Sequence, residues 1–551
     1  MEGNWRSRGA LAISWNDSKK EKKGKILALA LASLVTLAVA SPPMRAQMAD
    51  SMQQMVSVIV RALPGSETAA AETVEQAGGE VGMGIGIING FTAEVPKGTI
   101  GSLEATREIF TVTSDSTLHP QDHDGYDAAS DVSSMYNTAQ VVQANKVWSR
   151  GITGDGVDVA LIDTGVSPVA GMDDPGKVIN GPDLSFDSQY DEAQYLDGYG
   201  HGTHMAGIIA GRDAGFDPAS PDPHAFSGIA PDAGILNVKV GDYTGAADVS
   251  QVLAAIDWVV QHRNDNGMNI RVLNLSYGTD GTQSYLLDPL TFAVEVAWRH
   301  GIVVVVAGGN GGFGSPQLNN PAYDPFVIAV GGNDPSGTIG VGDDTVPDWS
   351  STGDGTRNPD LVAPGKSIAG LRVPGSLIDE EYPTARVGDR YFRGTGTSQS
   401  AAVVSGAAAL LLDQRPGLTP DQVKALLMGA ANRLPQADPI AQGDGELNVH
   451  LASQRPTPIS VQTFPPATGA GSLELARGTL HLEDGKKQLV GEYDIFGEAF
   501  DGRSWSLLSA TGRSWSGGDW NGRSWSGSDW SGRSWSGRSW SNEAWSGRSW
   551  S

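Results

Sequence analysis

The 551-residue chain contains no cysteine. This absence excludes disulfide bonds, thiol catalysis and cysteine-based zinc sites. If the protein is exported, its stability must therefore come from the size of its core, from kinetic trapping or from bound ions.

Basic residues are also scarce, with 38 Lys and Arg against 63 Asp and Glu and a net charge of −25. This charge argues against nucleic acid or an anionic membrane surface as the main partner, so we expect no nucleic-acid binding. It suits a soluble protein outside the cell, although solubility alone would also explain it. The length allows a large core and more than one domain.

The N-terminal region has only a short apolar run. Residues 26–40 are uncharged and mostly apolar, they follow a basic cluster at 19–25, and they end in Ala38-Val39-Ala40. A membrane-spanning helix needs roughly 20 apolar residues. The order is typical of a secretory signal peptide over residues 1–40, and it predicts a secreted protein, free or associated with the cell surface. An uncleaved anchor is the alternative.

Residues 41–135 predict a small separate domain followed by a polar linker. The expected order is strand, helix, two strands, helix and strand, which is typical of a ferredoxin-like α+β fold. The expected strands are 56–60, 81–88, 90–96 and 109–112, and the expected helices are 67–77 and 100–107.

Residues 136–450 alternate apolar strands with amphipathic helices. The strands are continuous runs of Val, Ile and Leu, as in parallel sheets that are covered on both faces. We therefore predict an α/β domain with a doubly wound, mostly parallel sheet, in which ligands bind at the carboxyl ends of the strands. The expected strands are 157–162, 235–240, 270–275, 302–307 and 326–330.

Reactive side chains stand where that rule places ligands. Asp163 follows the strand at 159–162, His201 opens a helix, and Ser398 precedes the apolar run at 401–412. A serine hydroxyl is a weak nucleophile that needs an imidazole to take its proton and a carboxylate to orient the imidazole. The chain order Asp, His, Ser is a known arrangement of this machinery. For Ser398 alone, an ordinary helix N-cap would be the simpler interpretation.

Asn310 supplies a further element of such a site. It follows a buried strand and lies among glycines, which leave its amide room to donate to an oxyanion. Losing one such donor typically costs about 100- to 1000-fold in turnover.

Together these motifs resemble those of the subtilisin-like serine proteases, the subtilases. The matching segments are Asp163-Thr164-Gly165, His201-Gly202-Thr203-His204, Ala307-Gly308-Gly309-Asn310 and Gly396-Thr397-Ser398, with residues 228–231, 274–278 and 363–365 between them. The resemblance implies a secreted serine endopeptidase that acts on proteins and peptides and needs no cofactor for its chemistry. It also implies that the domain at 41–135 is a pro-domain, which serves the enzyme as intramolecular chaperone and inhibitor.

The resemblance assigns roles to single residues. Ser398 would be the nucleophile, His201 the general base and then acid, and Asp163 the orienting carboxylate. The oxyanion would lie between the Asn310 side chain and the Ser398 N–H.

The same resemblance implies a substrate-binding region. Residues Ser276, Tyr277 and Gly278 would pair with an extended substrate backbone as one more strand. Gly308 and Gly309 would line the pocket for the side chain before the scissile bond, with Asn319 at its base. Glycines there favour sizeable apolar side chains.

Departures from the family pattern are few. Gln399-Ser400 stands where the family usually has Met-Ala, and Ala402 stands near the usual proline. None of these residues belongs to the triad, so activity is expected. The related sedolisin group uses Glu in place of His, and His201 in its motif argues against that group.

Metal binding stays open on the sequence. His204 is expected to be a packed helix residue. The acidic segments 183–197 and 213–222 suit either structural calcium or solvated loops, because they show no defined spacing of oxygen ligands.

The C-terminal part divides into a linker with a small β-rich extension at 451–500 and a repeat tail at 501–551. Gly-Arg-Ser-Trp-Ser recurs in the tail, and tryptophans recur at a step of five that fits neither a helix nor a strand. Dense Gly and Ser predict disorder. The tryptophans beside arginines suggest adhesion to cell-wall or extracellular polysaccharide, and a flexible tail without that role is the alternative.

The sequence thus predicts a secreted serine endopeptidase that works through an acyl-enzyme. A non-catalytic extracellular or cell-wall binding protein on a protease scaffold is the alternative. The intact set of Asp163, His201, Asn310 and Ser398 favours the enzyme, because a binding protein has no need of all four.

Overall fold

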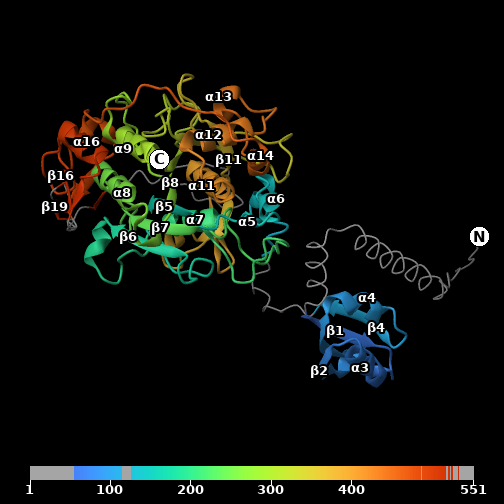
Figure 1. The fold of residues 1–551 in the computed structure, drawn as a ribbon. Coiled ribbons are helices and arrows are strands. Elements are labelled where there is room, and N and C mark those ends of the chain that lie inside the picture. Colours follow the sequence, from blue (N-terminus) through green and yellow to red (C-terminus); the bar gives the residue numbers. More distant parts are fainter. Residues whose placement is uncertain are drawn as a thin grey trace, which may run out of the picture. The chain divides into compact units, whose positions relative to one another are not determined.

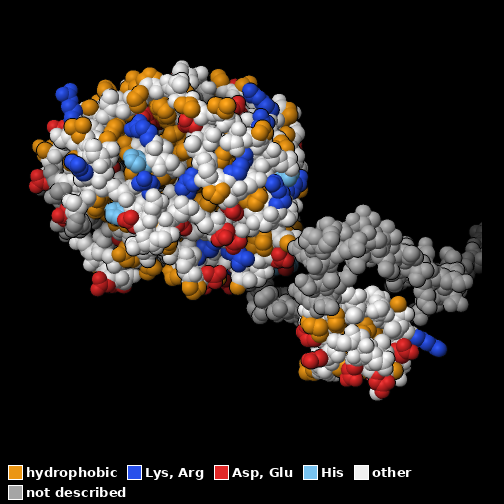
Figure 2. All heavy atoms as spheres, in the orientation of Figure 1, with side chains coloured by type: hydrophobic (Ala, Val, Ile, Leu, Met, Phe, Trp, Pro, Cys, Tyr) orange, Lys and Arg blue, Asp and Glu red, His pale blue; other side chains and the backbone are white. Residues whose placement is uncertain are grey.

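The computed structural model describes residues 55–114, 126–484, 487–516, 519–521, 523–524 and 531–532 (Figure 1), and Figure 2 shows the side chains on one face by type. The expected signal peptide at 1–40 and the tryptophans from Trp525 to Trp550 lie outside the described residues. The chain divides into two compact units, Met1–Gln121 and Asp122–Ser551, which are described separately.

In its described residues, 55–114, the N-terminal unit is a four-stranded antiparallel sheet with the helices α3 and α4. The sheet order is β2-β3-β1-β4, so the first strand is central. Val58, Val60, Val74, Phe91 and Leu103 form its core. This arrangement confirms the predicted ferredoxin-like fold. The elements are β1 (Met55–Ala62), α3 (Glu67–Gln76), β2 (Glu80–Ile85), η1 (Gly86–Ile88), β3 (Gly90–Pro96), η2 (Lys97–Thr99), α4 (Ile100–Glu104) and β4 (Ile109–Ser114).

The second unit is built on a seven-stranded parallel sheet of order β11-β10-β9-β8-β5-β7-β6. The chain starts at β5, places β6 at one edge and β7 between the two, and then crosses to the other side of β5 with β8. Such a reversal opens a crevice at the carboxyl ends of the strands. The predicted doubly wound α/β fold is confirmed. The strands are β5 (Asp158–Asp163), β6 (Val178–Asp183), β7 (Gly234–Lys239), β8 (Ile270–Leu275), β9 (Val303–Ala307), β10 (Ile328–Asn333) and β11 (Leu361–Pro364).

Helices cover both faces of this sheet (Figure 1). α7 (His201–Ala210) packs with α11 (Thr397–Gln414), and α8 (Val249–His262) packs with α9 (Pro289–Arg299). Every residue of α11 from Thr397 to Leu412 is buried, as expected for a helix that is apolar on nearly all sides. The remaining helices near this core are α5 (Met135–Val141), α6 (Asn145–Trp148), α12 (Pro420–Gly429), α13 (Pro439–Gln442) and α14 (Val449–Gln454).

Smaller elements complete the unit. A three-stranded antiparallel sheet of order β12-β14-β13 lies beside α7. Its strands and the neighbouring short helices are β12 (Ile368–Leu371), α10 (Leu377–Glu381), η5 (Pro383–Ala385), β13 (Arg386–Val387) and β14 (Tyr391–Gly394), and two further short helices are η3 (Phe186–Gln189) and η4 (Asp265–Gly267).

The chain after α14 packs along α8 and α9, as Figure 1 shows for its last helix. We call residues 456–520 the C-terminal extension. In the described part of this extension the β structure is limited to very short strands, and α15 and α16 are its helices. Its elements are α15 (Leu473–Arg477), β15 (Leu482–Asp484), β16 (Lys487–Gln488), α16 (Gly502–Ala510), β17 (Trp515–Ser516) and β18 (Asp519–Trp520), and β19 (Arg523–Ser524) and β20 (Ser531–Gly532) follow.

The start of the repeat tail corrects the expectation of disorder from residue 501 on. Asp501 caps α16 by accepting hydrogen bonds from the backbone of Arg503 and Ser504. Trp505 and Trp520 are fully buried. A Gly- and Ser-rich segment lacks the apolar area for a core of its own. It becomes ordered here because its tryptophans are buried against helices that already exist.

The carboxylate of Asp257, on α8, accepts hydrogen bonds from both of these tryptophans. Nε1 of Trp505 and Nε1 of Trp520 donate to Oδ2 of Asp257 at 3.0 and 2.9 Å. The Ser509 hydroxyl donates to the other oxygen at 2.5 Å. Burial raises the pKa of Asp257, and the hydrogen bonds from these donors oppose that shift. The indole groups thus bring apolar area and also satisfy a buried acid.

Replacing Trp505 tests whether the tail stabilises the second unit. Trp505→Ala should lower the free energy of unfolding by about 3–5 kcal/mol, because it leaves a cavity and removes a donor to Asp257. Leu507→Ala on the same helix is the control, since Leu507 is 71% exposed. Urea unfolding followed by circular dichroism measures both. Equal midpoints for the two variants would contradict a stabilising role of Trp505.

Candidate active site

The side chains singled out by the sequence stand at the ends of strands and the starts of helices along the carboxyl edge of the parallel sheet. Asp163 is the last residue of β5, His201 the first of α7, and Ser398 the second of α11. Their exposed fractions are 1%, 2% and 3%. Asn310 lies three residues after the end of β9 and is partly buried.

The imidazole and the carboxylate are in direct contact. Nδ1 of His201 lies 2.7 Å from Oδ1 of Asp163. Burial by itself would lower the pKa of His201, but the charge of Asp163 and its hydrogen bond raise it above the ordinary value, with a smaller contribution from Asp197. The pair therefore fixes the tautomer that has its proton on Nδ1, and it stabilises the imidazolium.

A second carboxylate, which the sequence analysis missed, holds this pair in place. Asp197 accepts hydrogen bonds from the backbone N–H groups of Gly200 at 2.6 Å and Thr203 at 2.7 Å, which fixes the first turn of α7. Asp197 also accepts a hydrogen bond from the Thr164 hydroxyl. The oxygen of the same hydroxyl accepts a hydrogen bond from the backbone N–H of Gly202. The signal in the sequence was an acidic residue just before a helix start, where orphan N–H groups need acceptors.

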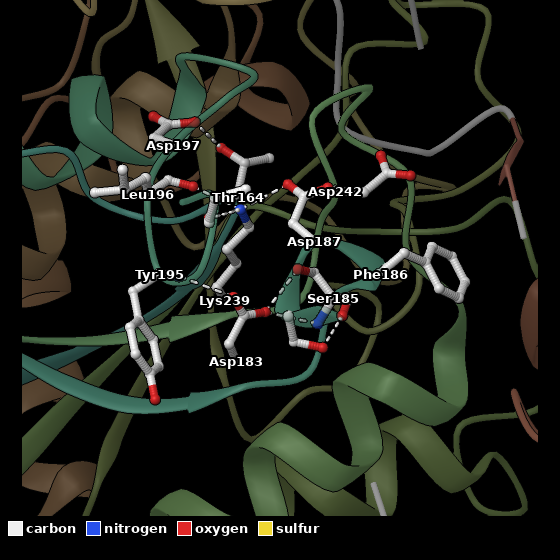
Figure 3. Close-up of polar contacts among 12 residues, drawn as sticks. Thr164, Asp183, Ser185, Phe186, Asp187, Tyr195, Leu196, Asp197, Lys239 and Asp242 are labelled. Carbon is white, nitrogen blue, oxygen red and sulfur yellow. Dashed lines mark hydrogen bonds and ion pairs between the residues drawn. The ribbon is translucent and has the colours of Figure 1, made fainter. Parts of the chain in front are cut away.

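A buried lysine organises the segment that leads to Asp197 (Figure 3). Lys239, the last residue of β7, stands beside Asp163 in the sheet register and is fully buried. Its Nζ lies 2.7 Å from Oδ2 of Asp187, 2.5 Å from the Leu196 carbonyl oxygen and 3.3 Å from that of Ala193. Residues 187–196 thus fold around an ammonium group.

The acidic segment 183–197 is largely folded into the domain. Asp183, Asp187 and Asp197 are buried, so the interpretation of this segment as a solvated loop is wrong for these carboxylates. Asp183 accepts bonds from the backbone N–H groups of Ser185 and Tyr195 (Figure 3). Among the described residues, no group of three or more His, Asp or Glu side chains is arranged to hold a metal ion. In the segment 213–222, Asp213 pairs with Arg390.

The Asn310 amide is oriented by the residue before the serine. Its Oδ1 accepts hydrogen bonds from the backbone N–H of Thr397 at 2.9 Å and from the Thr397 hydroxyl at 3.1 Å. The nitrogen end of the amide therefore points away from Thr397. The backbone N–H of Ser398 is in the first turn of α11, where N–H groups have no partner within the helix.

The expected substrate edge follows β8 in the sheet. The Ser276 hydroxyl accepts a bond from the Asn274 side chain at 3.1 Å. The Tyr277 side chain is buried and donates from its hydroxyl to the Gly245 carbonyl at 3.3 Å, so it points into the domain.

The expected pocket residues Gly308, Gly309 and Asn319 lie next to one another in the structure. The Asn319 side chain lies between Gly309 and Gly278. If a Cβ atom were added to Gly309, it would lie 2.6 Å from Oδ1 of Asn319, and a Cβ atom added to Gly278 would lie 3.0 Å from Cβ of Asn319. Gly308 contacts the same residue through its backbone, because its carbonyl oxygen accepts a hydrogen bond from the Asn319 N–H at 3.1 Å. Its own N–H donates to the Val330 carbonyl oxygen at 2.8 Å.

His204 behaves as expected of a packed residue. It is fully buried, and burial lowers its pKa to about 3. Its ring lies against the backbone of Gly370 and Gly394, which leaves no room for a side chain there.

Comparison with known proteins identifies the second unit. Residues 154–448 match the model of the subtilase family, Peptidase_S8. The chain belongs to the subtilase family. It is thus a serine-type endopeptidase, and the resemblance seen in the motifs is confirmed. The subtilase match ends before the C-terminal extension.

Several subtilases are similar in sequence. The serine protease AprX of Bacillus subtilis is 36% identical over 327 residues, which are 58% of this chain and 71% of that protein. Subtilisin DY of Bacillus licheniformis is 31% identical over 316 residues, 57% of this chain and 97% of that protein. Subtilisin Savinase of Lederbergia lenta is 31% identical over 313 residues, 57% of this chain and 96% of that protein.

Removing the Lys239 ammonium should destabilise the subtilase unit. Lys239→Met leaves Asp187 buried without a cation, which we expect to cost about 3–5 kcal/mol in the free energy of unfolding. Lys366→Met is the matched control, because the Lys366–Asp334 pair is partly exposed and should contribute at most about 1 kcal/mol. Urea unfolding in a Ser398→Ala background, which prevents self-digestion, measures both losses. A loss for Lys239→Met no larger than that of the control would contradict this role of the ammonium.

Proposed function

We propose that this subtilase is a secreted endopeptidase whose catalytic triad consists of Asp163, His201 and Ser398. The observation that carries the proposal is the 2.7 Å contact between Nδ1 of His201 and Oδ1 of Asp163, at the sheet edge where Ser398 opens α11. This contact and the family membership favour an enzyme over a binding protein on a protease scaffold.

The proposed reaction begins when Oγ of Ser398 attacks the substrate carbonyl carbon and its proton passes to Nε2 of His201. Asp163 stabilises the imidazolium that forms. The tetrahedral oxyanion is held by the Asn310 amide and the Ser398 N–H. His201 then protonates the leaving amine, the C–N bond breaks, and an acyl-enzyme remains. Water, deprotonated by His201, hydrolyses this ester and restores the serine.

The N-terminal unit is proposed to be the pro-domain. Its ferredoxin-like fold and its place before the catalytic unit support this role as chaperone and inhibitor. Secretion rests on the expected signal peptide at residues 1–40, outside the described residues. Within the part that the structure describes, no helix is long and apolar enough to cross a bilayer.

The polysaccharide-binding hypothesis now concerns only part of the tail. Trp505 and Trp520 are fully buried against α8, and Nε1 of Trp515 donates to the Ala254 carbonyl at 3.0 Å. We therefore propose that any adhesion to cell-wall polymers uses the later tryptophans, from Trp525 to Trp550, which lie outside the described residues.

A fluorophosphonate probe tests the nucleophile. The processed protein should be labelled, Ser398→Ala should not, and Ser400→Ala should remain labelled, which separates the two serines of the Gly-Thr-Ser-Gln-Ser motif. Asn310→Ala should lower kcat on a peptide substrate by about 100- to 1000-fold through loss of an oxyanion donor. Labelling of Ser398→Ala would overturn the assignment of the nucleophile.

The position of Asn319 predicts selectivity at the residue before the scissile bond. Because its side chain lies between Gly278 and Gly309, we propose that the pocket accepts small or polar side chains in place of the large apolar ones that the glycines suggested. Asn319→Gly should raise the ratio of kcat/KM for Phe over Ala at that position by about 10-fold or more.

Peptide substrates that differ only in that residue measure this ratio. Asn264→Gly, a change at an exposed position next to η4, is the control and should keep the ratio of the parent enzyme. A parent enzyme that already prefers Phe over Ala would contradict the proposed role of Asn319.

A further inference from the structure

The C-terminal extension reaches the two segments that carry the proposed substrate pocket. The carbonyl oxygen of Ala476, in α15, accepts hydrogen bonds from the Thr279 hydroxyl at 2.5 Å and from Nδ2 of Asn320 at 3.4 Å. Thr279 directly follows Gly278, and Asn320 directly follows Asn319. One carbonyl group thus contacts the residue next to each of the two pocket residues.

The two segments are also paired with each other. Thr279 N donates to the Asn320 carbonyl, and Asn320 N donates to the Thr279 carbonyl, both at 2.9 Å. Thr279 and Asn320 are fully buried. A Cβ on Gly281 would lie 2.7 Å from the Leu475 carbonyl oxygen, so the extension approaches this loop as closely as backbone allows. The pair and α15 therefore form one continuous hydrogen-bonded structure.

Both ends of α15 are fastened to the same loop. Before the helix, the backbone N–H of Ser472 donates to Oε1 of Gln283 at 2.9 Å, and Nε2 of Gln283 donates to the Ser472 carbonyl oxygen at 3.1 Å. After the helix, the Thr479 backbone N–H donates to Asp280 Oδ1 at 2.7 Å, and the Thr479 hydroxyl donates to Oδ2. We call residues 472–479 the clamp. It holds loop 279–283 from outside the catalytic unit's family match.

A buried ion pair anchors the clamp to a rigid element. Nε and Nη2 of Arg477 lie 2.7 and 3.2 Å from the two carboxylate oxygens of Asp248, and both side chains are buried. Burial by itself would raise the pKa of Asp248, but Arg477 lowers it below the ordinary value, so the pair is ionised. Asp248 is also the N-cap of α8. The position of α15 is therefore set by α8, against the sheet.

We propose that the clamp is a positioning element for the substrate-binding edge, and that Ala476 and Arg477 act through Thr279 and Asn320 to hold Gly278 and Asn319 at a fixed separation. An edge that pairs with an extended peptide must be preformed, because ordering it on binding would cost affinity. The inference rests on the proposed function, which places the substrate along Ser276–Gly278. It predicts that this family member depends on its C-terminal extension for substrate affinity and selectivity.

Thr279→Val in the full-length enzyme tests the clamp, because it nearly keeps the side-chain shape while it removes the hydroxyl that donates to Ala476 and accepts from the Gly281 N–H at 3.3 Å. KM for an extended peptide should rise by about 10-fold, the weight of one neutral hydrogen bond, with kcat within about twofold. The difference in kcat/KM between substrates with Phe and with Ala before the scissile bond should become smaller. The labelling rate with a small fluorophosphonate, which does not pair with the edge, should stay that of the parent enzyme.

Controls separate positioning from loss of structure. Thr279→Ser restores the hydroxyl and should restore KM and selectivity. Thr511→Val removes a similar hydroxyl-to-carbonyl bond at the end of α16 and should leave both unchanged. Thr279→Val with unchanged KM and selectivity would overturn the clamp, and so would equal losses in kcat, labelling and KM that Thr279→Ser does not reverse. Failure of the parent enzyme to label would instead overturn the proposed triad.

Discussion

The contact between His201 and Asp163 is the constraint on which the rest of this structure depends. A carboxylate and an imidazole, both almost fully buried, must stay within hydrogen-bond distance although they come from different elements, β5 and α7. Burial penalises each charge, so the arrangement is stable only if neighbouring donors are fixed as well. Asp197 fixes the first turn of α7, and Lys239 fixes the loop before Asp197. The reactive pair is therefore the innermost layer of a larger polar network.

Buried acids that need fixed donors also hold the C-terminal extension in place, in a chain that has no disulfide bonds. Each of three acids on the helical face opposite α7 and α11 receives a donor from the C-terminal extension. Asp248 receives Arg477, Asp257 receives two indoles, and Glu295 receives the backbone N–H of Ala467 at 2.8 Å. A buried carboxylate that loses its donor costs more than the bond itself contributes, so each acid makes detachment of the extension unfavourable. Distant parts of the chain are thus joined by non-covalent contacts that are specific in geometry.

Much of this could be predicted from local pattern. The parallel sheet followed from continuous Val, Ile and Leu runs such as β9, and the site followed from motifs whose chemistry needs particular residue types. Long-range pairing could not be predicted. The sequence around Lys239 gives no sign that its ammonium group contacts the Leu196 carbonyl oxygen. The Gly- and Ser-rich composition around Trp505 predicts disorder, because the sequence does not show that Asp257 on α8 accepts a bond from this indole.

The extension changes what a family match implies for this chain. The match covers the proposed triad and Asn310, and it ends before residues 472–479, whose Ala476 carbonyl accepts the hydrogen bond from Thr279. A reaction constrains its catalytic groups tightly, because a small displacement of one of them slows the reaction strongly. A pocket wall needs only some fixed support, and any segment that satisfies its polar groups can provide it. In this subtilase the support comes from residues 472–479 and is anchored by Arg477 to α8. Substrate selectivity can therefore depend on residues that lie outside the segment 154–448, which matches the family.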